Sequence, residues 1–324
     1  MKKIFLRSIA VIIIVVVLVF SGLLIYVKTA LPDVGPPPDI AIEITPERVK
    51  RGEYLANHVW LCMDCHSDRD WTKFSAPPNP GTQGSGGDEF TQEMGFPGHY
   101  YATNITPDGI GDWTDGEVLR AITTGVSKDG RALFPIMPYP YLGKADVEDI
   151  YSVIAYIRTL PAVEKTYPES SSDFPMNFII NLIPQEADFQ PSPSQSDPVA
   201  YGEYLSWACI ECHTVAEKGQ IDLNLAFAGG RDFPLPFGGI IYSSNITPDI
   251  ETGIGKWTEK QFIDRFKAYA DSNYVSQKVE KNAFNSYMPW EMFAGMTEND
   301  LSAIYAYLMT LEPQVNEVKR FVPD

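Results

Sequence analysis

Cysteine and histidine are both scarce in this chain of 324 residues, which contains four of each. All four cysteines lie in two short stretches, residues 62–66 and 209–213, and both stretches read C-x-x-C-H. Two of the four histidines close these stretches. So few residues concentrated in one repeated pattern indicate a shared chemical function.

Basic residues are also few, since 25 lysines and arginines face 42 aspartates and glutamates, and the formal net charge is −17. Nucleic acid and anionic membrane surfaces are poor partners for so acidic a body, so we expect no nucleic-acid partner. A basic docking face on a redox protein would suit this charge, although a solvated exterior explains it equally well. A content of 44% hydrophobic and 21% charged residues favours a globular chain.

The N-terminal part contains a long apolar run, residues 9–27, which follows Lys2, Lys3 and Arg7. The run is long enough to cross a bilayer as a helix, and no convincing cleavage site follows it. We therefore expect an uncleaved signal anchor over residues 1–30, with the basic end in the cytoplasm. A second apolar stretch, residues 178–183, is too short to span a bilayer, and we expect it to pack against a domain or a partner.

The pattern C-x-x-C alone is compatible with a zinc site, a redox dithiol or haem attachment. A zinc ribbon places its cysteine pairs about 15 to 20 residues apart, and Cys65 and Cys209 are far more distant. A redox dithiol needs no histidine directly after it, yet His66 and His213 occupy that position in both copies. C-x-x-C-H is the attachment signature of c-type haem, with Cys62, Cys65, Cys209 and Cys212 as the attaching thiols. We therefore expect two covalently bound haem c groups.

The remainder of the chain repeats as well, which identifies the unit that carries each motif. The matching segments, in chain order, are residues 52–55 with 202–205, 104–108 with 245–249, 109–114 with 253–258, 137–138 with 288–289, and 155–160 with 306–311. Two copies of one domain explain these matches. We name residues 46–161 the first repeat and residues 198–313 the second repeat.

The predicted fold class is all-α, with two tandem domains after one transmembrane helix. Thr114 with Glu117, and Thr258 with Gln261, have the spacing of a capping box and predict helix starts. The last helix of each repeat carries an apolar stripe that we expect in the core: Ile150, Val153, Ile154 and Ile157, and Leu301, Ile304, Tyr305 and Leu308. A proline-rich spacer is expected at residues 31–45, a linker at 162–197 and a tail at 314–324.

A c-type haem iron takes two axial ligands, and His66 and His213 would each supply one. Met137 and Met288 follow at matched positions in the two repeats, and each precedes a proline that would stiffen its loop. A methionine sulfur raises the reduction potential and closes the iron to substrate. We therefore predict His66 with Met137, and His213 with Met288, as iron ligands, the alternative being that these methionines fill the core.

The two remaining histidines are predicted to play no part in haem binding. His58 precedes His66 on what reads as the same helix, so it should not reach across the iron. His99 has no counterpart in the second repeat.

Repeated polar and aromatic side chains are candidates for the haem wall. Asn104, Trp113, Asn245 and Trp257 could donate hydrogen bonds near the haem carboxylates. Their segments are also rich in turn formers, so turn and capping chemistry explains them equally well.

These motifs resemble the membrane-anchored, multi-haem class I cytochromes c, such as the cytochrome subunits of bacterial alcohol and gluconate dehydrogenases. The resemblance rests on C-x-x-C-H, N-I-T-P-D followed by G-I-G-x-W-T, M-P and the closing A-Y-[IL]-x-T-L, and covers about residues 50 to 312. Those subunits typically carry three haem domains, and the repeat occurs twice here. The resemblance implies a single-pass protein of the bacterial inner membrane, with haem domains facing the periplasm.

We therefore expect a dihaem cytochrome that passes single electrons between a periplasmic or membrane donor and an acceptor in a respiratory chain. Its partners would be redox proteins such as a dehydrogenase or oxidase subunit, and we expect no activity of the chain alone. A dihaem peroxidase is the enzymatic alternative, and it would need an iron with an open or displaceable sixth position. A cytochrome subunit of a periplasmic dehydrogenase complex is a further alternative that differs only in its partner.

Overall fold

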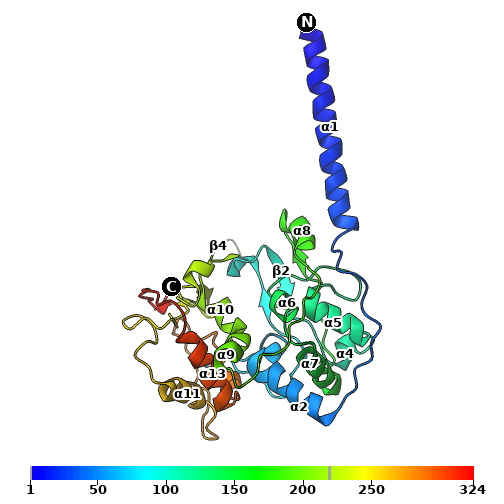
Figure 1. Ribbon diagram of the computed structural model, residues 1–324. Helices are drawn as coiled ribbons and strands as arrows, with labels where there is room; N and C mark the ends of the chain where they lie inside the picture. Colours follow the sequence, from blue (N-terminus) through cyan, green and yellow to red (C-terminus); the bar gives the residue numbers. More distant parts are fainter. Residues whose placement is uncertain (1, 218–219) are drawn as a thin grey trace.

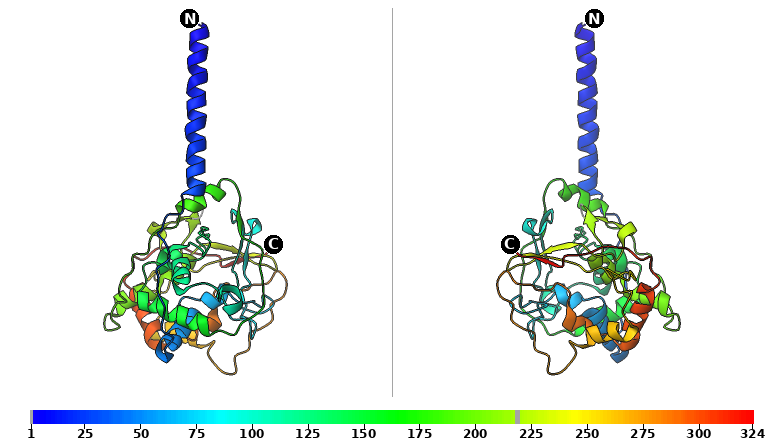
Figure 2. Two further views of the ribbon diagram at one scale, coloured as in Figure 1. Left: turned by 90° about the vertical axis from the view of Figure 1, so that its right-hand side faces the viewer. Right: turned by 90° about the vertical axis from the view of Figure 1, so that its left-hand side faces the viewer.

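The computed structural model describes residues 2–217 and 220–324 of the chain. A long helix, α1 (Lys2–Thr29), stands away from a globular body that contains both repeats (Figures 1 and 2). Among the described residues, one helix is long and apolar enough to cross a membrane, at Lys3–Thr29, with a mean hydropathy of 3.2. A signal sequence near the N-terminus would meet the same criterion.

The first repeat is built largely from short helices joined by long loops. Its elements are α2 (Pro46–Tyr54), η1 (Leu55–Val59), α3 (Cys62–Cys65), β1 (Glu89–Phe90), η2 (Gln92–Met94), β2 (Gly98–Tyr101), α4 (Pro107–Ile110), α5 (Asp115–Thr124), α6 (Tyr139–Leu142) and α7 (Val147–Thr159).

The linker, the second repeat and the tail also consist of short helices and strands joined by loops. Their elements are β3 (Ser171–Ser172), α8 (Met176–Ile179), η3 (Ile180–Leu182), α9 (Pro198–Leu205), α10 (Trp207–His213), β4 (Ala216–Glu217), β5 (Gln220–Ile221), η4 (Leu223–Leu225), β6 (Asp232–Pro234), β7 (Ile240–Tyr242), α11 (Glu259–Lys267), α12 (Trp290–Phe293), α13 (Glu298–Leu308) and β8 (Phe321–Val322).

The all-α expectation is only partly right, because short strands accompany the helices. Within residues 2–217 and 220–324 they form three small antiparallel sheets, in the orders β1-β2-β3, β4-β5 and β6-β7-β8. Two of the pairs join segments distant in sequence, β2 with β3 and β7 with β8. These strands are too short to show an alternating apolar pattern in the sequence.

Both predicted helix starts are confirmed by reciprocal capping. Thr114 begins α5 with its hydroxyl accepting from the Glu117 N–H, and Thr258 begins α11 in the same way with Gln261. The expected core stripes on α7 and α13 are buried, apart from Tyr305, which is half-buried.

In each repeat the first helix crosses the last one closely, and a glycine at the crossing makes this possible. α2 packs on α7, and α9 packs on α13. A Cβ atom on Gly52 would lie 1.9 Å from the Ser152 carbonyl oxygen, and one on Gly202 would lie 1.9 Å from the Ala303 carbonyl oxygen. The recurring G-E-Y-L segment therefore marks a helix crossing that admits no side chain.

The two repeats meet through two tyrosine–aspartate hydrogen bonds, and in each bond the tyrosine and the aspartate come from different repeats. Tyr54 of the first repeat donates its hydroxyl proton to Asp300, and Tyr204 of the second donates to Asp149 at 2.8 Å. Each tyrosine oxygen also accepts the backbone N–H at the start of the partner helix, from Thr297 at 3.0 Å and from Asp146 at 3.4 Å. The repeats are thus joined by an approximate two-fold interface.

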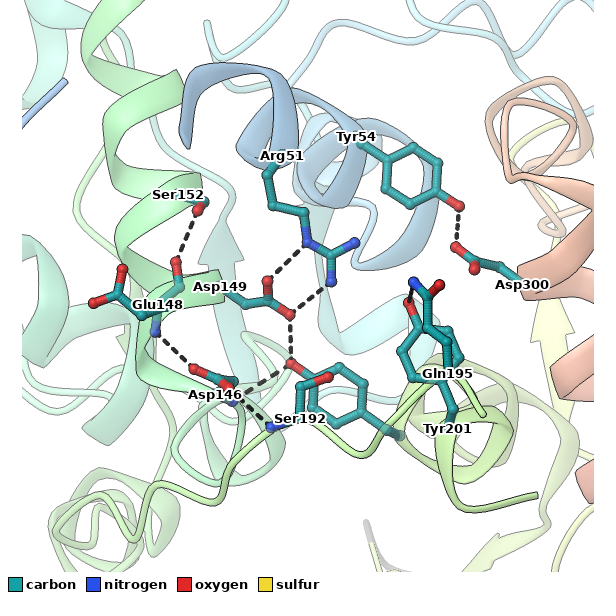
Figure 3. Close-up of polar contacts among 11 residues, drawn as sticks. Arg51, Tyr54, Asp146, Glu148, Asp149, Ser152, Ser192, Gln195, Tyr201 and Asp300 are labelled. Carbon is teal, nitrogen blue, oxygen red and sulfur yellow. Dashed lines mark hydrogen bonds and ion pairs between the residues drawn. The ribbon is translucent and has the colours of Figure 1, made fainter. Parts of the chain in front are cut away.

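One cation breaks the symmetry of this interface. Arg51 forms two hydrogen bonds of 2.8 Å with Asp149 (Figure 3). The position before the glycine in the second repeat holds Tyr201 in place of an arginine. Asp149 therefore has a guanidinium partner, whereas Asp300 lacks the equivalent one.

The connecting segments pack against the body. The proline-rich spacer after α1, residues 31–45, contains no helix or strand and packs along the first repeat. The Ile42 N–H donates to Asp115 at 2.8 Å, and Ile40 and Ile42 pack against the core. In the linker, α8 and η3 contact the end of α1 (Figure 2). The Lys28 ammonium lies 5.0 Å from the centre of the Phe178 ring. The short apolar stretch thus packs against α1.

Candidate haem-binding cavity

A continuous cavity of about 1230 Å³ lies inside the body and is lined by both repeats. All the residues predicted for the haem sites line it: Cys62, Cys65, His66, Asn104, Trp113, Met137, Cys209, Cys212, His213, Asn245, Trp257 and Met288. Residues more than 200 positions apart in the sequence therefore share one interior space. His58 and His99 are not among the residues that line this cavity.

The cysteines line the cavity, where surrounding protein atoms desolvate their sulfur atoms although Cys212 is exposed toward the cavity space. Burial raises the pKa of Cys62 and of Cys209 to about 12, and that of Cys212 to about 11. Such thiols stay protonated at neutral pH, which is opposite to the lowered pKa of a reactive redox dithiol. No cluster of three or more His, Cys, Asp or Glu side chains suited to a metal ion occurs in the described part of the chain. The dithiol and zinc alternatives therefore find no support.

Both histidines of the motifs are prepared to bind iron through the same nitrogen. The Nδ1 atom of His66 lies 2.7 Å from the Thr103 carbonyl oxygen, and that of His213 lies 2.7 Å from the Ser244 carbonyl oxygen. Nδ1 must carry the proton in both contacts, so the lone pair is left on Nε2. Burial also lowers the pKa of His66 and of His213, which favours the neutral form that ligates metals.

The carbonyl groups that orient these histidines belong to the residues directly before the repeated N-I-T-P-D segments. The side-chain oxygen of Asn104 accepts from the Thr106 N–H at 2.9 Å and from the Thr106 hydroxyl at 2.7 Å, which closes a tight turn. Asn245 and Thr247 repeat both bonds. Each turn fixes the residue before the asparagine, whose carbonyl holds the histidine. The segment therefore positions the iron ligand, a role that the sequence alone did not reveal.

The asparagine amides are already used within the protein. The Nδ2 atom of Asn104 donates to the Val163 and Lys165 carbonyls, and that of Asn245 donates to Thr252 and to the Gln314 carbonyl. Direct donation from Asn104 or Asn245 to haem carboxylates remains a prediction. The side-chain oxygens of both residues close their own turns, and the amide nitrogens bind the segment that follows the last helix of the same repeat.

An acidic residue precedes the second cysteine of each motif and pairs with an arginine. Asp64 lies 3.2 Å from Arg69, and Glu211 lies 3.6 Å from Arg231. Each guanidinium also lies over an aromatic ring. The Cζ atom of Arg69 is 4.6 Å from the centre of the Trp71 ring, and that of Arg231 is 5.7 Å from the centre of the Phe233 ring. The shared acidic position was visible in the sequence. The arginine partners were not, because they come from different places in the two repeats.

The arginine of the first repeat is almost fully buried together with two carboxyl groups. The side chain of Arg69 is 3% exposed, and its Nη1 atom lies 3.2 Å from Asp64 and 3.2 Å from Asp88. Burial, opposed by the guanidinium, raises the pKa of Asp88 to about 7. Asp88 occupies the position that Arg231 holds in the second repeat, because each residue directly follows a pair of glycines. The first glycine of each pair donates its N–H to the carbonyl oxygen of the motif histidine. The first motif thus has an acidic residue at a position where the second motif has a basic one.

The donor set, the neutral thiols and the largely apolar cavity together fit a covalently attached haem. Cysteine pairs, a histidine with its Nε2 free and a methionine on the same cavity wall are the groups that haem c requires. This combination defines a c-type cytochrome.

Comparison with known proteins agrees with this class. The cytochrome c family model matches residues 199–312, so this part of the chain is a cytochrome c domain. It is 30% identical over 293 residues to the gluconate 2-dehydrogenase cytochrome c subunit of Pantoea cypripedii, covering 81% of this chain and 59% of that one. It is 31% identical over 297 residues to the alcohol dehydrogenase (quinone) cytochrome c subunit of Gluconobacter oxydans, covering 85% and 57%.

A shorter relative is also similar along its length. The diheme cytochrome c-type protein of Cereibacter sphaeroides is 29% identical over 232 residues, which cover 65% of this chain and 71% of that one. The chain spans a little over half the length of the dehydrogenase subunits it matches.

Proposed function

We propose that the chain is a dihaem cytochrome c with tandem domains at residues 46–161 and 198–313. The observation that carries this proposal is the presence of two complete donor sets around one continuous cavity. His66 and Met137 would hold the iron of the first site, and His213 and Met288 that of the second. Cys62, Cys65, Cys209 and Cys212 would attach the two groups.

The residues of the chain make the sites suited to electron transfer. Bound haem c supplies a one-electron couple, which the protein tunes through ligation, burial and hydrogen bonding. The backbone contacts of His66 and His213 hold each imidazole in one orientation. Ligation by Met137 and Met288 would leave neither iron with an open position for peroxide or another substrate, and this favours electron transfer over a peroxidase. Because both sites line the same cavity, an electron can pass between them through the protein interior.

We further propose that the protein serves a dehydrogenase-type partner at the periplasmic face of the inner membrane, within a respiratory chain. The names of its relatives, as cytochrome c subunits of alcohol and gluconate dehydrogenases, support this kind of partner. The helix α1 would anchor the chain, with Lys2, Lys3 and Arg7 on the cytoplasmic side. The net charge of −17 favours a basic docking face on the partner.

Purification of the full chain from membranes in mild detergent tests this function. We expect a catalytic dehydrogenase subunit to be purified with it, and its substrate to reduce both haem groups. A chain that is purified alone from every growth condition and that the candidate dehydrogenase does not reduce would contradict the partnership. Rapid turnover of peroxide by the wild-type chain would contradict the electron-transfer assignment.

A further inference from the structure

The loop that carries Met288 is held by a side chain of the other repeat. The hydroxyl of Ser75 donates to the Met288 carbonyl oxygen at 2.6 Å and accepts the Trp290 N–H at 2.9 Å. One hydroxyl group of the first repeat therefore bonds to peptide groups on both sides of Pro289. Ser75 thus binds the backbone on both sides of the M-P dipeptide, which contains Met288, the predicted iron ligand.

Ser75 is itself fixed in place by the second repeat. It is 2% exposed and has a φ of 67°, a left-handed conformation that a residue other than glycine rarely adopts. Its N–H donates to the side-chain oxygen of Asn285 at 2.9 Å, and the amide nitrogen of Asn285 donates to the Trp71 and Lys73 carbonyls. The hydrogen bonds cross between the repeats in both directions, so the position of the hydroxyl is well determined.

A second contact from the first repeat reaches the far end of the same loop. The Nδ1 atom of His58 lies 2.7 Å from the Met292 carbonyl oxygen. Gly295 leaves room for the imidazole, since a Cβ atom there would lie 2.2 Å from the ring. Trp71 also packs against Tyr287 with ring centres 4.6 Å apart. The first repeat thus contacts the loop before, at and after Met288.

The corresponding loop of the first repeat is held differently. The Met137 N–H donates to the Phe134 carbonyl at 3.1 Å, and its carbonyl accepts the Tyr139 N–H at 2.8 Å, both within the first repeat. The Met288 carbonyl has the same local bond from Trp290 at 2.9 Å. The Ser75 hydroxyl is an addition, and among the described residues Met137 has no side-chain partner of this kind. The second repeat also contacts the Met137 loop, because the Tyr141 hydroxyl donates to Glu211 at 2.5 Å and the Tyr141 ring stacks on Trp207. The Met288 loop differs in that a hydroxyl group of the other repeat bonds to the peptide groups beside its methionine.

We infer that Ser75 is a positioning residue for Met288, so that the first repeat sets the strength of methionine ligation in the second. This inference rests on the proposed ligation of each haem by histidine and methionine. A methionine loop that is less firmly held leaves its sulfur more easily displaced, and the reduction potential falls as the methionine bond weakens. The potential of the second site is then a property of both repeats.

The test compares full-length, haem-loaded Ser75→Ala and Ser75→Gly with wild type. Both variants lack the hydroxyl, and glycine also accepts the positive φ, so an effect of backbone strain is separated from an effect of the lost hydrogen bonds. Ser152→Ala is the matched control, because Ser152 is a buried serine of the first repeat whose hydroxyl bonds only to the Glu148 carbonyl of its own helix. Met137→Ala and Met288→Ala assign the spectral signals of the two sites.

We measure the upfield-shifted methyl resonance of each iron-bound methionine in the reduced protein, both potentials, and the affinity of the oxidised protein for imidazole. In Ser75→Ala and Ser75→Gly we expect about tenfold tighter imidazole binding at the second site, the change that corresponds to about 1.4 kcal/mol from a lost hydrogen bond. The potential of that site should fall and its methyl resonance should broaden. The first site and the Ser152→Ala protein should match wild type.

Unchanged imidazole affinity and potential at the second site in Ser75→Gly would overturn the inference, even if Ser75→Ala showed an effect. Equal changes at both sites would also overturn it, because they would indicate a general loss of stability. If the wild-type protein lacks two methionine resonances, or if Met288→Ala removes neither, the proposed ligation itself is wrong. The two failures are therefore distinguishable.

Discussion

Removing a tyrosine hydroxyl group from the interface between the repeats should lower the free energy of unfolding far more at Tyr54 than at Tyr204. The hydroxyl of Tyr54 donates to Asp300, which is 4% exposed and has no other hydrogen-bond partner for its carboxylate among the described residues. The hydroxyl of Tyr204 donates to Asp149, which keeps its two bonds of 2.8 Å to Arg51. The geometry of the two tyrosines is similar, and only the carboxylate's remaining partners differ.

The expected magnitudes follow from what each substitution leaves behind. Tyr54→Phe strands a buried carboxylate and also deprives the Thr297 N–H of its acceptor, so we expect a loss of about 2 to 3 kcal/mol in the free energy of unfolding. Tyr204→Phe leaves Asp149 paired with the guanidinium, so we expect a loss of about 1 kcal/mol. Both substitutions keep the aromatic ring, and packing is therefore preserved.

Urea unfolding of the haem-loaded protein, followed by circular dichroism and by tryptophan fluorescence, measures both losses. Arg51→Met combined with Tyr204→Phe serves as the control, because it removes the remaining partners of Asp149 and should raise the cost of the tyrosine change toward that of Tyr54→Phe. A cost for Tyr204→Phe equal to or greater than that for Tyr54→Phe in the wild-type background would refute this reasoning.

Three further outcomes are expected. Met137→Ala and Met288→Ala should each remove the far-red sulfur-to-iron absorption of one site and lower one potential; a full band in either variant would show that its sulfur is no ligand. Deleting residues 1–30 while supplying a cleavable export signal should release a haem-loaded protein from the membrane fraction; continued membrane binding would show that α1 is not the anchor. Burial lowers the pKa of His58, so the unfolded chain takes up the proton first as the pH falls below about 6.5. Stability should therefore fall over this range in wild type and stay flatter in His58→Gln, as measured by urea unfolding between about pH 7.5 and 5.5; equal slopes would exclude His58 as the cause.

The parts of the fold that sequence reasoning predicted are those whose cause is local. Helix starts at Thr114 and Thr258 follow from side chains that bond three residues along the chain. The core stripe of α7 follows from helical periodicity. The short strands were missed because two or three residues carry no periodic signal, and their pairing depends on segments such as β3 and β8 that are distant in sequence.

The candidate site divides in the same way. The haem-attaching cysteines and their histidines form a contiguous motif, and comparison of the two copies also pointed to Met137 and Met288. The Ser75 contact with Met288 could not be found like this, because it occurs once and joins residues more than 200 positions apart. Arg69 was hidden for a related reason: its counterpart, Arg231, comes from a different place in the second repeat.

Counting the haem groups bound per chain tests the central claim most directly. The measurement combines the alkaline pyridine absorbance of the purified full-length protein with its intact mass after denaturation. We predict two covalently bound groups in wild type, and one in the double variants Cys62→Ala with Cys65→Ala and Cys209→Ala with Cys212→Ala. A single group in the wild-type protein, or two groups in either double variant, would contradict the account.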